Sequence, residues 1–128
     1  MKKKVVIHEF DPVIYPRKLW VAITKERNTL VKQFYNDIDN IEIVLPDNSH
    51  TLGAITFSCY KLDSKDYGIL IIFDNKEICN TKTIAHEATH AADFMLQRLG
   101  EDDAGMECYA YLVGWIAECC EKVKLNKE

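Results

Sequence analysis

The sequence AITFSCYKLDSKDYGILIIF, residues 54–73, predicts two β-strands joined by a turn. Apolar and polar side chains alternate over residues 54–60, as in a strand with two different faces. The polar run at residues 63–66 has the composition of a turn, and residues 67–73 are almost entirely apolar. We therefore expect a β-hairpin. One face of its first strand carries Ile55, Phe57 and Cys59, and the other carries Thr56, Ser58 and Tyr60.

Hydrophobic periodicity and turn residues predict further elements on both sides of this hairpin. Strands are expected at residues 4–9, 18–23 and 41–45, and helices at 25–38, 81–99 and from about 103 to 122. In the helix at 25–38, Leu30, Val31, Phe34 and Ile38 share one side. The chain has no repeat or low-complexity linker, so residues 1–128 predict a single domain. The fold class is α+β: a small mixed sheet with a helix packed on it, followed by two helices.

Composition excludes several classes of function. The net charge of −4, with acids and bases interspersed, provides no surface for nucleic acid. No apolar run is long enough for a secretion signal or a membrane span, so we expect a cytoplasmic protein with no membrane partner. The five cysteines are odd in number and lack C-x-x-C spacing, which favours reduced, mostly buried thiols.

The motif His86-Glu87-Ala88-Thr89-His90, an H-E-x-x-H sequence, lies within the helix expected at 81–99. Residues four apart stack on one helix face, so both imidazoles can bind one metal ion, with Glu87 beside them as a general base. Four histidines in 128 residues yield about 0.01 chance matches per chain, so coincidence is a poor explanation. Zn²⁺ is the expected cofactor.

A catalytic zinc ion takes three protein ligands, and two acids are candidates for the third. Glu107, in the first turn of the final helix, can close a tetrahedral site from a second helix. Small residues at Ala110 and Gly114 suggest that the two helices approach closely on that side. Asp93 shares the face of His86 and His90 but is tethered one turn away with a short side chain. We favour Glu107 as the ligand and Asp93 as the acceptor for a histidine ring N–H, with Asp93 as the alternative ligand.

With Glu107 on the following helix, the motif resembles the zincin metallopeptidases, specifically the gluzincin branch and its minimal single-domain members, called minigluzincins. The resemblance implies a zincin-like core in which Tyr67–Phe73 is the sheet edge that pairs with an extended peptide or protein substrate. It also implies a mechanism. Zinc held by His86, His90 and Glu107 lowers the pKa of a bound water toward about 7. Glu87 takes the proton of that water and returns it to the leaving amine.

Larger family members place a His or Tyr where it stabilises the oxyanion, and no histidine follows His90 in this chain. Tyr111, four residues after Glu107, is the best candidate for that role, and Tyr109 is a weaker one. Packing of both tyrosines in an apolar helix is the alternative. The chain also has no second domain to form the far wall of a cleft, so a partner or a second subunit could complete it.

These observations support three hypotheses. The first is an intracellular zinc-dependent hydrolase, most plausibly a peptidase acting on one or a few protein targets. The second is a catalytically weak or inactive zincin-fold interaction module with a structural zinc, and the third is a metal-free α+β protein. Glu87 separates the first two hypotheses, because a structural zinc site has no use for a glutamate beside its first histidine.

Overall fold

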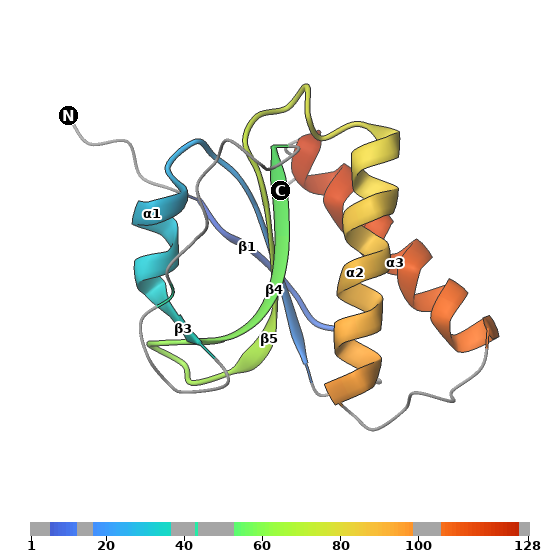
Figure 1. Ribbon diagram of the computed structural model, residues 1–128, viewed down its shortest axis with the longest axis horizontal. Helices are drawn as coiled ribbons and strands as arrows, with labels where there is room; N and C mark the ends of the chain where they lie inside the picture. The colour runs from blue at the N-terminus through green and yellow to red at the C-terminus, as the bar shows by residue number, and fades with distance from the viewer. Residues whose placement is uncertain (1–5, 13–16, 37–42, 44–52, 99–105, 126–128) are drawn as a thin grey trace.

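A mixed sheet of five strands forms the middle layer of the protein in the computed structural model, which describes residues 6–12, 17–36, 43, 53–98 and 106–125 (Figure 1). The strand order is β1-β2-β5-β4-β3. The strands are β1 (His8–Phe10), β2 (Lys18–Ile23), β3 (Phe34–Asn36), β4 (Ala54–Lys61) and β5 (Tyr67–Phe73). Three helices accompany the sheet: α1 (Arg27–Leu30), α2 (Thr81–Arg98) and α3 (Met106–Lys124). The predicted α+β class is thus confirmed.

The predicted hairpin is present as β4 and β5, which pair antiparallel from Ala54 opposite Phe73 to Tyr60 opposite Tyr67. On its other side β5 pairs parallel with β2, from Lys18 opposite Gly68 to Ile23 opposite Phe73. Since β5 has a neighbour on both sides and lies between two packed layers, it is buried almost throughout. Its nearly continuous apolar sequence follows from that position.

The alternation of side chains along the strands divides the core into two parts. The larger part lies between the sheet and the pair α2 and α3, on the face that carries Ala54, Ile69 and Ile71. The smaller part lies on the opposite face beside α1 and includes Trp20 and Leu70. In Figure 1 α1 lies on one side of the sheet, whereas α2 and α3 lie together on the other. The sheet is therefore covered on both faces.

Helix α2 begins where its sequence predicts. The side-chain Oδ1 of Asn80 accepts a hydrogen bond from the backbone N–H of Thr83 at 3.0 Å, which satisfies one donor of the first turn. Ile84, Ala88, Ala91 and Met95, spaced four, three and four residues apart on one side of this helix, are buried. The alternation of β4 and the periodicity of α2 together place the H-E-x-x-H motif over the β4 side of the sheet.

The helix predicted at residues 25–38 is wrong in extent. Helix α1 covers only Arg27–Leu30, a 3₁₀ turn follows at Val31–Gln33, and Phe34 begins strand β3. Long-range pairing outweighs local periodicity here, because Phe34–Asn36 pairs with β4 and Tyr35 stacks on Tyr60 with ring centroids 5.2 Å apart. Of the strand predicted at 41–45 the structure describes only Ile43, which it does not assign to a strand. Leu99 and the segment before Met106 lie outside the described residues. Of residues 4–9, the described part is extended only from His8.

All five cysteines are free thiols, as expected from their number and spacing, and Cys108 alone is exposed. Burial raises the pKa of the Cys79 thiol to about 11 and that of Cys119 to about 12. These thiols are neutral and act as small apolar core residues at neutral pH. Within the described residues, no helix has both the length and the apolar character needed to cross a bilayer.

Candidate functional site

The two motif histidines lie on the exposed face of α2 and point toward each other. One helical turn separates His86 from His90, and their Nε2 atoms are 3.2 Å apart. The rings are nearly perpendicular, with an interplanar angle of 80°. Phe94, one turn further along, stacks on His90 with an interplanar angle of 19°. The sequence thus arranges two exposed imidazole nitrogens around a common point.

This spacing fits a shared metal ion. Zn–N bonds of 2.0–2.1 Å at a tetrahedral angle place two ligand nitrogens about 3.3 Å apart. The observed 3.2 Å agrees with that value. In the metal-free protein the same distance allows one ring to donate an Nε2–H hydrogen bond to the other. Imidazole nitrogens are also ligands that suit Zn²⁺ chemically.

Glu87 points away from solvent and into the seam between α2 and β4. Its side chain is only 5% exposed. The hydroxyl of Thr56, on β4, donates a hydrogen bond to Oε1 of Glu87 at 2.6 Å. Sequence reasoning missed Thr56, because alternation assigned it to a face of its strand but did not show that α2 packs on that face.

Asp93 and Tyr109 lie beside the motif, on the side of α3. Asp93 accepts a hydrogen bond from Gln97 Nε2 at 3.0 Å, and no contact with a histidine ring N–H is observed among the described side chains. The Tyr109 hydroxyl donates to the backbone carbonyl oxygen of Thr89 at 3.1 Å. Burial, and secondarily the nearby Asp93 carboxylate, raises the pKa of Tyr109. Tyr109 is therefore a neutral hydroxyl held against the motif helix.

Glu107 and Tyr111 lie on the outer face of α3. Both are exposed, Tyr111 to 67%, whereas Leu112 and Ile116 on the same helix are buried against the core. A Cβ built on Gly114 has no atom within 4 Å, so the expected close approach of two helices there is wrong. The structure brings together two of the three predicted zinc ligands. No group of three His, Cys, Asp or Glu side chains that could hold a metal occurs in the described part of the chain.

The expectation that Tyr67–Phe73 forms the edge of the sheet is wrong, since β5 is the central strand between β2 and β4. The strand next to the motif is β4, and β3 pairs only with its Cys59–Lys61 end. No strand among the described residues covers the outer side of Ala54–Ser58. Thr56, which contacts Glu87, lies within this uncovered segment.

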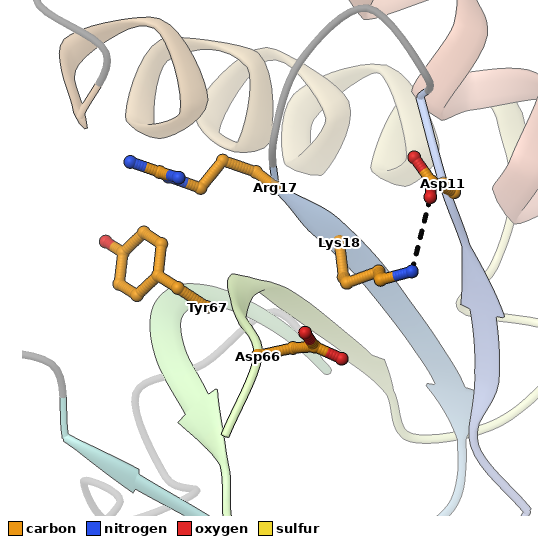
Figure 2. A pocket seen from close by; sticks show the side chains of 5 residues that line it. All are labelled: Asp11, Arg17, Lys18, Asp66 and Tyr67. Carbon is orange, nitrogen blue, oxygen red and sulfur yellow. Dashed lines mark hydrogen bonds and ion pairs between the residues drawn. The ribbon is translucent and has the colours of Figure 1, made fainter. Parts of the chain in front are cut away.

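A small charged pocket lies elsewhere, at the start of β5 (Figure 2). Its volume is about 220 Å³, and its lining residues are Asp11, Arg17, Lys18, Asp66 and Tyr67. The Asp11 carboxylate bonds Lys18 Nζ at 3.2 Å and raises the pKa of that lysine. The Arg17 guanidinium lies 4.8 Å from the centre of the Tyr67 ring. Two cations balance two acids, so the lining carries no net charge that would select an anion or a cation.

This pocket is separate from the motif. Thr56 pairs with Ile71, four residues along β5 from Tyr67, which corresponds to about 13 Å of strand. The site of interest is thus the surface where α2 meets β4.

Comparison with family models, with curated proteins and with solved structures found no match for this chain. The interpretation of the site therefore depends on its own geometry.

Proposed function

We propose that this protein is an intracellular zinc-dependent hydrolase that acts as a peptidase. The observation that carries the proposal is the pair of Nε2 atoms on His86 and His90, which converge at a distance suited to one zinc ion. Glu87, next in the sequence to the first of these histidines, adds a carboxylate at the same turn of α2. Five free thiols are consistent with a reducing compartment.

Each side chain has a defined task in this proposal. His86 and His90 hold the metal, which when bound supplies a Lewis acid that makes water nucleophilic near neutral pH. Glu87 accepts the proton of the attacking water and delivers it to the leaving amine. The third ligand remains Glu107 or Asp93. For the role of oxyanion stabiliser, Tyr109 is a better candidate than the exposed Tyr111, because its hydroxyl already bonds Thr89 of the motif.

Among the described residues no strand pairs with the outer side of Ala54–Ser58, and an extended peptide could pair with β4 there. An extended segment can add to an exposed strand edge through backbone hydrogen bonds, which explains affinity without a deep cleft. The edge adjoins Glu87 through Thr56, so a peptide paired there lies next to the motif. A partner or a second copy of the chain could form the opposite wall.

The first experiment measures zinc content and hydrolysis together. Protein purified without chelators is expected to carry about one zinc per chain. His86→Ala should lose the metal, whereas Glu87→Gln should keep it and lose hydrolysis of a quenched fluorescent peptide library. His8→Ala, which removes a histidine on β1, is the matched control and should change neither property. A wild-type protein without stoichiometric metal would contradict the proposal.

A second comparison assigns the third ligand. Glu107→Ala and Asp93→Ala are measured for zinc content against Glu118→Ala, a control that removes another exposed acid from α3. If Glu107 binds the metal, only the Glu107 variant should lose zinc. Full retention of zinc by that variant, together with loss in Asp93→Ala, would assign the ligand to Asp93.

The outward position of Glu107 and Tyr111 favours a second candidate function, a zinc-containing interaction module without turnover. In that case zinc is stoichiometric in the wild type, no peptide in the library is cleaved, and Glu87→Gln behaves as the wild type.

A further inference from the structure

Thr56 and Glu87 form a polar pair in an otherwise apolar seam. Thr56 lies on the face of β4 that α2 covers, and its hydroxyl donates to Glu87 Oε1 at 2.6 Å. The neighbouring positions in this seam are apolar and buried, among them Ala54, Ala88 and Ala91. Glu87 is the only buried acidic side chain in the described part of the chain.

Burial of a carboxylate is costly unless a donor replaces the lost water. An apolar residue in place of Glu87 would pack this seam at lower cost, so helix packing does not explain the acid. Thr56 compensates part of the cost by one short hydrogen bond. The pair is therefore better explained by what the carboxylate does than by the stability of the fold.

The hydrogen bond also restricts the orientation of the carboxylate. The last side-chain torsion of glutamate has a broad, nearly two-fold profile, so a carboxylate without a partner turns easily. A donor fixed on a strand binds one oxygen, Oε1, so the carboxylate cannot turn without losing that hydrogen bond. The Thr56 hydroxyl on β4 thus occupies Oε1 of Glu87 and leaves Oε2 as the oxygen that can accept a proton.

We propose that Thr56 is a positioning residue for Glu87, which holds the carboxylate so that Oε2 acts as the general base; this inference depends on the proposed hydrolase function. As the water oxygen bonds to the scissile carbonyl carbon, its proton passes to Oε2. When the C–N bond breaks, that proton passes to the leaving amine nitrogen. Thr56 keeps its own proton throughout and touches no reacting atom.

The test compares Thr56→Val, which replaces the hydroxyl by a methyl group, with Thr56→Ser, which keeps the hydroxyl. In the zinc-loaded protein, Thr56→Val should lower kcat by about tenfold to a hundredfold with KM nearly unchanged. Thr56→Ser keeps the hydroxyl, so its kcat should stay close to that of the wild type. Thr29→Val makes the same chemical change on an exposed residue of α1 and should have no effect. If Thr56→Val does not fold, Thr56→Ala against Thr56→Ser provides the same comparison.

Equal kcat values in Thr56→Val and the wild type, or equal losses in the Val and Ser variants, would overturn the proposal. If the wild type binds zinc but cleaves nothing, the proposed function fails separately, and crystal structures of the variants then decide. A Glu87 carboxylate that turns away in Thr56→Val and returns in Thr56→Ser supports positioning. A carboxylate that keeps its place in both variants refutes it.

Discussion

Gly68 of β5 lies directly against β2, and this contact predicts a large effect of a small substitution. A Cβ at this position would lie 2.3 Å from the Lys18 carbonyl oxygen and 2.7 Å from Cζ3 of Trp20. Lys18 is the register partner of Gly68 in the parallel pair. Real contacts of this kind begin near 3 Å, so Gly68→Ala must push the two backbones apart by most of an ångström.

The expected cost has two parts. Overpacking of a buried site costs about 1–3 kcal/mol, and weakening of one backbone hydrogen bond adds about 1 kcal/mol. We therefore expect Gly68→Ala to lower the free energy of unfolding by about 3 kcal/mol. With an unfolding entropy of about 2.1 cal/mol/K per residue over 128 residues, the fall in Tm is about 11 °C.

Gly114→Ala is the matched control, because a Cβ there meets no atom within 4 Å. Alanine favours a helix over glycine by about 0.5–1 kcal/mol, so this variant should gain stability. Urea unfolding followed by far-UV circular dichroism measures both changes. A Gly68→Ala variant within 0.5 kcal/mol of the wild type would refute the close contact of β2 and β5. Destabilisation by Gly114→Ala would show that this side of α3 is packed against another element. It would then support the expected close approach of two helices at Gly114.

Two further predictions concern ion pairing and alkaline pH. Arg27, 3% exposed, bonds Asp74 at 2.8 Å, so Asp74→Ala should cost about 2–3 kcal/mol of unfolding free energy, measured by urea titration. Asp63→Ala, which removes an exposed pair, should cost less than about 0.5 kcal/mol, and similar costs for the two variants would contradict the assigned burial. Burial raises the folded-state pKa of Cys79 and Cys119. Above about pH 9 the unfolded chain therefore loses thiol protons that the folded protein retains. In that range each of the two thiols should lower the free energy of unfolding by about 1.4 kcal/mol per pH unit. Cys79→Ala should remove the contribution of one thiol, about 1.4 kcal/mol per pH unit, from the dependence of unfolding free energy on pH. An unchanged pH dependence would refute the burial of that thiol.

Local sequence patterns correctly predicted the strands and the helix whose own side chains show a clear period. The alternation in residues 54–60 and the apolar run at 67–73 predicted β4 and β5, and helical spacing predicted α2. The convergence of His86 and His90 follows from the same spacing, since residues one turn apart are neighbours on any helix. These features depend on contacts within a few residues.

Contacts between distant segments were beyond the reach of these patterns. Residues 25–38 have the periodicity of a helix, yet pairing with β4 converts Phe34–Asn36 into a strand. The position of β5 depends on its parallel pairing with β2, so the hairpin alone did not identify β4 as the strand beside the motif. Glu107 was assigned by helix order, but the orientation of α3 depends on which of its sides is buried.

The sequence by itself thus determined the α+β class, the motif helix and the pair of imidazoles, because each is set by the period of one element. Only the tertiary structure decided that Glu87 is buried, that Thr56 donates to it from β4, and that Glu107 and Tyr111 face outward. The physical reason is that periodicity determines which residues share a face, whereas packing determines what that face contacts.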